Sequence, residues 1–246
     1  MAIARHSAPA ATEDNTCDTS YTFAVDVGSG SDRCLVVIVY AEQDSGPGSQ
    51  DVSSMTYNGT AMTEAVESVA PSSASTSEEV YLWYLLNPDA NSNNLVVNMG
   101  AVGQDVVIQP LVYTGVDSIG DIDSTAAADT AHSTLTLTTT KDNSLIVCGI
   151  STEVAAAGPI TPDADTVEVV DDFMPTLDTL GMNWFVGERA TTSISSYAVG
   201  GTQTGANAPR DHNMVALELK EVAAAGGDAP TGTFYGPLGG CFAGPI

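Results

Sequence analysis

Histidine, serine and aspartate are the residue types in this chain that would support hydrolysis. The chain has three histidines, His6, His132 and His212. His212 follows Asp211, and a neighbouring serine would complete a Ser-His-Asp arrangement, in which histidine activates the hydroxyl as a nucleophile. The sequence lacks the Gly-x-Ser-x-Gly turn that exposes such a serine, since residues 28–31 have serine in the wrong register. We therefore expect no catalytic residues and no enzyme.

Acidic side chains are numerous enough to form pairs by chance. Glycosidases use two facing carboxyl groups, but the adjacent acids at 78–79 and 171–172 are typical of solvated strand ends or turns. Two short segments, Asp121-Ile122-Asp123 and Asp163-Ala164-Asp165, each offer oxygen ligands of the kind that Ca²⁺ prefers. Neither segment has the spacing of an EF-hand loop. We expect no cofactor and keep calcium at these segments as the alternative.

The four cysteines and one aromatic cluster offer other chemistry. Cys34 and Cys148 lie in apolar runs, where a free cysteine behaves as a small hydrophobe. Cys17 and Cys241 lie near the chain ends, so either all four thiols are reduced or these two form a disulfide within or between subunits. The aromatic residues at 81, 83 and 84 would suit a stacked sugar, but strand alternation predicts that at least one of their faces is core.

Net charge excludes several classes of partner. The chain has 31 acidic and 6 basic residues, for a net charge of −25. This balance disfavours binding to nucleic acid, which needs a Lys/Arg footprint, and docking on anionic lipid. The acidity suits either a surface that keeps the protein soluble, as at high salt, or carboxylate clusters that collect divalent cations. We also expect no membrane span and no secretory signal peptide.

Hydrophobic patterning predicts an antiparallel β-sandwich. The run at 34–40 is apolar on both faces, as in the middle of a covered sheet. Asn58-Gly59 predicts a two-residue hairpin, and this turn accounts for both residues although Asn58-Gly59-Thr60 also matches a glycosylation sequon. We expect about ten strands in a sandwich or jelly roll, minimal helix and no internal repeat. The segments with strand-like patterning, from which these strands are expected to form, cover 21–27, 34–42, 52–57, 61–69, 80–86, 95–99, 106–116, 134–138, 145–150, 167–173, 182–186, 193–199 and 214–219.

Composition divides the chain into a central domain and two terminal arms. Residues 1–20 have no periodicity and are expected to form a flexible N-terminal arm, and residues 21–222 form the sandwich. Pro110 is expected at an edge or bulge. Residues 223–246 form a glycine-rich, apolar arm that either folds back on the domain or inserts into a neighbouring subunit. Its candidate anchoring residues are Phe234, Tyr235, Leu238, Cys241, Phe242 and Ile246.

Four sequence segments carry a family resemblance. They are Gly-Ser-Asp-Arg-x-Leu-Val-Val at 30–37, Val-Ser-Ser-Met-Thr-Tyr-Asn-Gly-Thr-Ala-Met-Thr at 52–63, Val-Tyr-Leu-Trp-Tyr-Leu-Leu-Asn-Pro at 80–88 and Leu-Val-Tyr-Thr-Gly-Val-Asp at 111–117. In this order the segments resemble a β-sandwich module of tailed-phage virion proteins, capsid decoration or cement proteins among them, and of some bacterial surface proteins. Asn58 stands where that family has glycine. The resemblance covers about 23–117 and implies fold and setting rather than catalysis.

The resemblance leads to the expectation of a capsid decoration protein. Its partners would be the major capsid protein or other shell subunits, with a homo-oligomer, a trimer in particular, as the expected assembly. The protein would be made in the host cytoplasm and act on the capsid surface of a virion. The alternatives are an adhesin or fibre module that binds a carbohydrate or receptor, and a filament subunit assembled by strand addition.

Overall fold

The computed structural model confirms the all-β class, with no helix in the part of the chain that it describes. The described residues are 2–15, 18–43, 52–69, 77–100, 105–128, 132–154, 156–175, 181–204 and 211–223. They form 18 strands, whereas the sequence predicted about ten. Part of the difference arises at Gly115, whose φ of 77° ends one strand and begins another within the run expected at 106–116.

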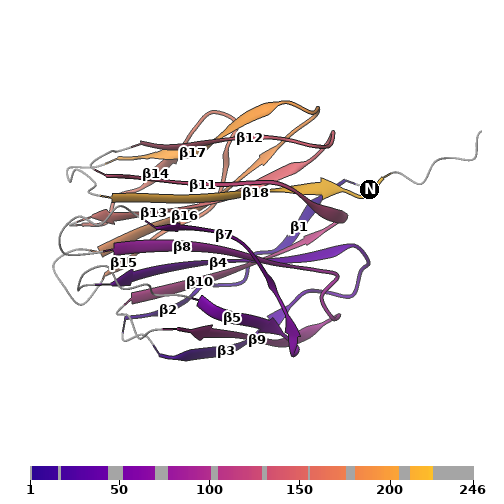
Figure 1. The fold of residues 1–246 in the computed structure, drawn as a ribbon, viewed down its shortest axis with the longest axis horizontal. Helices are drawn as coiled ribbons and strands as arrows, with labels where there is room; N and C mark the ends of the chain where they lie inside the picture. Colours follow the sequence, from indigo (N-terminus) through magenta and orange to yellow (C-terminus); the bar gives the residue numbers. More distant parts are fainter. Residues whose placement is uncertain are drawn as a thin grey trace, which may run out of the picture.

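The strands form four antiparallel sheets, numbered I to IV by their order in space (Figure 1). Sheet I contains β3 (Ser20–Asp26), β9 (Ser92–Met99), β5 (Val52–Tyr57) and β6 (Thr60–Ala61). Sheet II contains β1 (Ala4–Ser7) and β2 (Thr12–Asp14), both paired with β10 (Asp105–Thr114), and then β4 (Arg33–Gln43), β8 (Ser77–Leu86) and β7 (Thr63–Val69). Sheet III contains β11 (Val116–Ala128), β18 (Asp211–Glu221), β13 (Leu145–Val154), β16 (Gly181–Ala190) and β15 (Val167–Pro175). Sheet IV contains β12 (His132–Thr138), β17 (Ser196–Gln203) and β14 (Ile160–Pro162).

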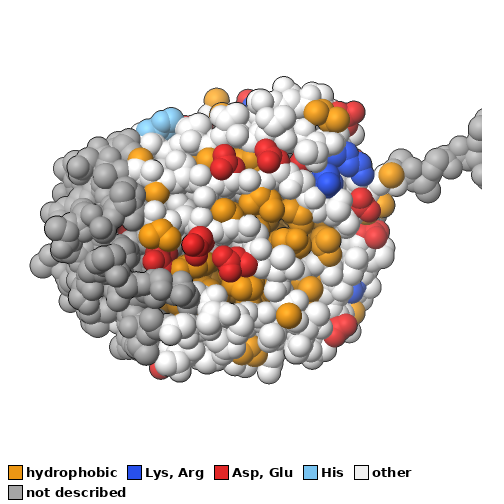
Figure 2. All heavy atoms as spheres, viewed as in Figure 1, with side chains coloured by type: hydrophobic (Ala, Val, Ile, Leu, Met, Phe, Trp, Pro, Cys, Tyr) orange, Lys and Arg blue, Asp and Glu red, His pale blue; other side chains and the backbone are white. Residues whose placement is uncertain are grey.

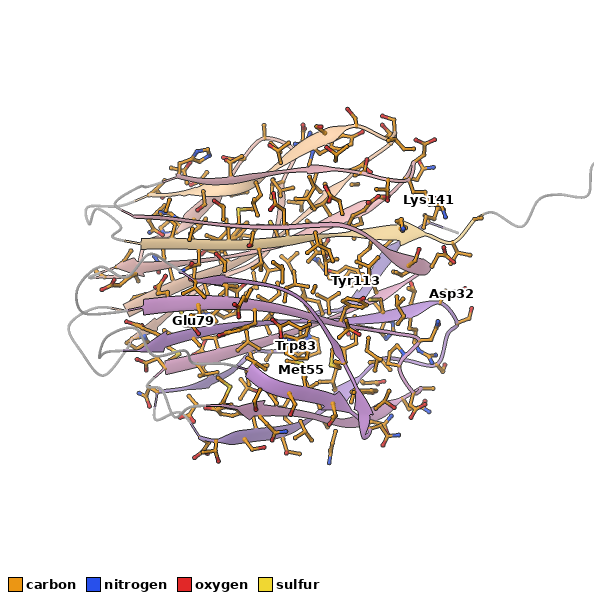
Figure 3. The ribbon with its side chains drawn as sticks, viewed as in Figure 1. Asp32, Met55, Glu79, Trp83, Tyr113 and Lys141 are labelled. Carbon is orange, nitrogen blue, oxygen red and sulfur yellow. The ribbon has the colours of Figure 1, made fainter. Side chains whose placement is uncertain are left out.

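Three hydrophobic cores separate the four sheets. Met55 and Trp83 belong to the core between sheets I and II, and Tyr113 belongs to the central core between sheets II and III (Figure 3). Leu137 and Phe185 belong to the core between sheets III and IV. The molecule is therefore two sandwiches stacked face to face, and its two middle sheets are covered on both sides.

Strand β4 shows why the sequence carries a run that is apolar on both faces. Leu35 and Val37 point into the core shared with sheet I, whereas Val36 and Ile38 point into the central core. Alternate side chains of a strand face opposite sides of its sheet, so a middle-layer strand needs apolar residues at both parities. The prediction of a covered central strand is confirmed.

The predicted Asn-Gly turn is confirmed, whereas the hairpin expected between 52–57 and 61–69 is confirmed only for the short β6, because residues 63–69 cross to sheet II as β7 and pair there with β8. Asn58 and Gly59 have φ values of 48° and 77°, and the flanking residues Tyr57 and Thr60 are paired as β5 and β6. Both central residues need positive φ in a type I′ turn, which is the reason for this residue pair.

The two sandwiches have the same strand order, although the sequence shows no repeat. Each half is counted as eight strands, with β1 and β2 together as the first strand of the first half and β6 as an extension of β5. In both halves the middle sheet then has the order first, eighth, third, sixth, fifth, and the outer sheet has the order second, seventh, fourth. The turn before the third strand also has the same form in both halves, since Asp32 and Asn143 have φ values of 55° and 56°.

Aligning these two turns makes Ile38 and Gly149 equivalent positions, because each lies six residues after the positive-φ residue. The two residues meet at the centre of the molecule. A Cβ atom added to Gly149 would lie 2.9 Å from Cγ2 of Ile38 and 2.9 Å from Oη of Tyr40. Strands β7 and β8 of sheet II contact β11 and β18 of sheet III, so the middle sheets stack with their strand orders reversed. This arrangement is an approximate twofold relation about an axis along the strands.

The N-terminal segment is paired rather than free along much of its length. β1 and β2 pair with two separate stretches of β10, around 112–114 and 106–108. Pro110 lies between these stretches, where β10 has no ladder partner on that side among the described residues. Proline has no N–H to donate, so this gap suits it, although β10 itself is an interior strand rather than an edge.

The two ends of the stacked sandwiches differ. Ala4 pairs with Thr114, and the backbone N–H of Val222 donates to the carbonyl of Gly115 at 3.0 Å. The first strand and the last described residues therefore meet at one end, called here the terminal end. Asp32 and Lys141 lie at this end and Glu79 lies toward the opposite end (Figure 3).

The contact at Gly149 leads to a stability prediction. We expect Gly149→Ala to lower the free energy of unfolding by about 1–3 kcal/mol, because the new methyl group would overpack the centre of the molecule. Gly30→Ala is the matched control, since a Cβ there meets nothing within 4 Å. Denaturant unfolding followed by circular dichroism measures both variants. Equal stabilities would show that the close approach at Gly149 is not a constraint.

Candidate functional site

The predicted anchoring residues Phe234, Tyr235, Leu238, Cys241, Phe242 and Ile246 lie outside the described residues. The structure does show where the described part of the chain ends before these residues. The described chain ends at Ala223, next to Val222 and Gly115 at the terminal end, and β1 begins at the same end. The first and last described residues of the chain thus lie close together at the terminal end.

Basic side chains share this end. Arg5 and Arg33 lie opposite Tyr113 and Thr114 in the sheet II ladders. The ammonium of Lys141 donates to the carbonyl of Glu221. The Lys and Arg residues in the described part of the chain are Arg5, Arg33, Lys141, Arg189 and Lys220. On the face in Figure 2 the basic atoms gather toward the end at which Lys141 lies in Figure 3, whereas acidic atoms are spread along the block.

Glu218 organises the backbone at the terminal end. Its buried carboxylate accepts hydrogen bonds from the backbone N–H of Thr140 at 2.9 Å, the hydroxyl of Ser144 at 2.6 Å and the backbone N–H of Asp121 at 3.0 Å. Burial favours the neutral acid, but the bond from Ser144 and the backbone donors outweigh it and lower the pKa of Glu218. Gly120 leaves space for the carboxylate, since a Cβ there would overlap Oε2. This arrangement is structural, because the protein's own donors occupy both oxygens.

His132 and His212 lie in different surroundings, with a serine beside His212 and an aspartate and a threonine beside His132. His212 is 1% exposed, and its Nδ1 lies 3.0 Å from the hydroxyl of buried Ser133. Nε2 of His132 lies 2.9 Å from Asp163 at the surface, where Thr134 bonds to both. Burial of Ser133 and His212 leaves no room for a substrate at that pair.

The acidic pairs considered for calcium are engaged by different partners. Asp163 contacts His132, whereas Asp165 forms an ion pair with Arg189 at 3.0 Å. Asp121 accepts the backbone N–H groups of Ile122 and Thr138. No group of three or more His, Cys, Asp or Glu side chains suited to a metal ion occurs within the described ranges.

The prediction of solvated acidic strand ends is wrong for Glu78 and Glu79, which are 1% and 3% exposed. Glu78 lies opposite Glu42 in the sheet II ladder and accepts a hydrogen bond from Ser151 of sheet III at 3.0 Å. Glu79 accepts a hydrogen bond from Tyr81. Strand alternation could have predicted the burial of Glu78, because its side chain points to the same face of β8 as those of the core residues Val80 and Leu82.

The aromatic cluster at 81, 83 and 84 is core rather than a sugar platform. Tyr81 and Trp83 share the face that packs against sheet I, and Tyr84 packs partly buried in the central core. Cys34 and Cys148 are buried free thiols, and burial raises the pKa of both, that of Cys148 to about 12. Cys17 and Cys241, the pair considered for a disulfide, lie outside the described residues.

Cavities gather along β15, an edge strand of sheet III. One cavity of about 300 Å³ is lined by Gly158, Asp171, Phe173 and Asn183, among others. A second, of about 410 Å³, lies on the opposite side of the strand, between β15 and the N-terminal segment. Burial raises the pKa of Asp171 to about 6, and the charges of Glu168 and Asp172 add to this effect, although the N–H of Ile160 opposes it.

Comparison with known proteins gives no relative, since no family model, curated protein or solved structure matches the chain. No helix of the described residues is long and apolar enough to span a membrane.

The hydrogen bonds to Glu218 predict a pH-dependent contribution to stability. A carboxyl group whose pKa is lowered on folding stabilises the fold above its unfolded pKa, and that contribution is lost as pH falls through the folded pKa. We expect Glu218→Gln to lower the free energy of unfolding at pH 7 by about 1–3 kcal/mol. The difference from the unmodified protein should shrink in strong acid. Urea unfolding across pH measures this, with Glu67→Gln as the exposed control, and a difference independent of pH would contradict it.

The raised pKa of Asp171 predicts a pH dependence of stability opposite in sign to that of Glu218. Its pKa is raised on folding, so the ionised form that prevails above about pH 6 is destabilising. We expect Asp171→Asn to melt at a higher temperature than the unmodified protein at pH 8, with the difference diminishing below about pH 6. Calorimetry across pH tests this, and a variant that is less stable at pH 8 would contradict it.

Proposed function

We propose that this chain is a structural virion protein, a capsid decoration protein that attaches to its shell at its terminal end, through the C-terminal arm. The observation that carries the proposal is the common position of the two chain ends, at Ala4 and Val222, on one end of a rigid block. Because β1 and β2 pair the N-terminal segment into sheet II, the expected flexible arm at 1–20 is not free, and attachment would depend on the C-terminal arm, which continues from this same end. The buried aromatic and aliphatic side chains of three stacked cores make the block stiff.

The distribution of charge also supports attachment with the terminal end facing the shell. The net charge of −25 would make most faces of the protein repel one another and keep decorated particles apart. The described Lys and Arg residues lie toward the terminal end, so this end is the one at which repulsion from an acidic shell is smallest. The apolar and aromatic residues of 231–246 would make the contacts with the shell. This mode of attachment suits a homo-oligomer, such as a trimer, as well as single copies.

A carbohydrate-binding adhesin or fibre module is the second candidate, and the cavity at Phe173 favours it. Its lining combines an aromatic ring with carboxylate and amide groups, which is a composition typical of a small-molecule site and offers hydrogen-bond partners for sugar hydroxyls. The Phe173 ring lies over Gly181, where an added Cβ would overlap ring carbons. A module of this kind would bind its ligand through this cavity rather than through the terminal arms.

Immunogold electron microscopy of the native source separates these functions. Antibody raised against the folded block should label icosahedral heads evenly if the protein decorates capsids. Label confined to fibres, tails or cell surfaces would overturn the proposal and favour the adhesin.

A tail variant tests the mechanism. Replacing Phe234, Tyr235 and Phe242 by serine should abolish co-sedimentation with particles stripped of the protein. The melting temperature should stay within about 1 °C, because the proposal assigns these residues to contact with the shell rather than to the core of the block. Phe173→Ser is the matched control and should still co-sediment. Binding that survives the tail variant but fails in the control would contradict anchoring by the arm.

A further inference from the structure

The cavity between β15 and the N-terminal segment arises where the two halves stop being equivalent. In the second half the first strand, β11, pairs with β18 along its length and packs Ile119 and Ile122 into the central core. In the first half the corresponding strand is divided into β1 and β2, and residues 8–11 between them leave the β10 ladder. The space that β11 fills on one side of the molecule is therefore open on the other, with a volume of about 410 Å³.

Apolar side chains make the walls and floor of this cavity, called here the β2–β15 groove. Pro9 and Ala11 form one wall, and Val169 and Val170 form the other. Trp184 contributes to the floor and is 1% exposed. Its ring is held by Tyr40, with centroids 5.7 Å apart and an interplanar angle of 42°.

Two carboxylates contribute to the lining. Partial desolvation raises the pKa of Glu13, the nearby charge of Asp172 raises it further, and the indole N–H of Trp184 lowers it. The polar group that lines the inner part, Gln109, donates to the carbonyl of Pro9 at 2.9 Å. Among the described residues, the lining includes no Lys or Arg. No basic residue of the described ranges therefore lies between the negative charges of Glu13 and Asp172 in the groove.

We propose that the β2–β15 groove binds a lysine or arginine side chain presented by a partner protein. The aliphatic stem of such a side chain would lie along Pro9, Val169 and Val170, where it buries apolar surface. Its cationic group would lie near Glu13 and Asp172 and donate charge-assisted hydrogen bonds to their carboxylates. A neutral apolar side chain would pack against the walls of the groove equally well, but it would not neutralise the charges of Glu13 and Asp172. This site is separate from the terminal end and does not depend on the virion proposal.

A titration with two matched probes tests the groove on the full chain. N-acetyl-lysine methylamide carries the cation, and N-acetyl-norleucine methylamide has the same stem without it. The chain has two tryptophans, so the Trp184 indole gives one of two side-chain N–H signals in a ¹⁵N correlation spectrum, and Trp83 in another core is the internal reference. We expect the lysine probe to shift the Trp184 signal saturably and to leave the Trp83 signal in place.

Substitution of the acids completes the test. Glu13→Gln with Asp172→Asn should weaken binding of the lysine probe by about fivefold to tenfold, as expected for two exposed ion pairs. Glu67→Gln, on the equivalent edge strand β7, should leave it unchanged. Equal responses to the two probes, or full affinity in the double variant, would overturn the proposal. A shift of the Trp83 signal alone would also overturn it, because the probe would then bind at a different core.

Discussion

The contact between sheets II and III is the constraint on which the rest of the molecule depends. Each sheet already covers an outer sheet, and its other face is equally apolar, so neither sandwich can leave that face in water. Gly149 lets the two sheets approach at their centre, and Tyr40 of sheet II donates a hydrogen bond to the carbonyl of Phe185 in sheet III at 2.7 Å. Toward the terminal end, Glu188 of sheet III accepts the hydroxyl of Tyr113 at 2.8 Å and pairs with Arg5 at 2.9 Å.

Because sheets II and III are covered on both faces, their buried polar groups need hydrogen-bond partners from within the protein. Glu78 and Ser151 face each other across the central interface, and Asn213 donates to the backbone carbonyl of Glu78. Glu218 has the same role at the terminal end, since it accepts donors from both a turn and a strand irregularity. A polar group in a middle sheet has no access to water, so its partners must come from the neighbouring sheet or turn.

Local features of the sequence predicted local structure well. The Asn58-Gly59 hairpin, the two-faced apolar strand β4 and the alternating leucines of β12 all follow from turn geometry and strand parity. The four-layer stack and the internal twofold relation were not predicted, because equivalent positions share parity and strand order rather than residue type, as Ile38 and Gly149 illustrate. Strand pairing between segments distant in sequence, such as β2 with β10, likewise has no local signal. The anchoring residues of 234–246 stay predictions, since they lie outside the described residues.

The internal twofold relation gives a way to separate structural from functional features. A feature present in both halves, such as the turns at Asp32 and Asn143, serves the fold that both halves share. The chain ends and the divided first strand occur once, and a fold that needed only stability could have repeated the continuous strand β11 in both halves. The opening beside Trp184 costs buried apolar contact that the other side of the molecule retains. Such a loss is tolerated most readily where a partner restores the contact, which is the physical reason to look for ligands at the places where the two halves differ.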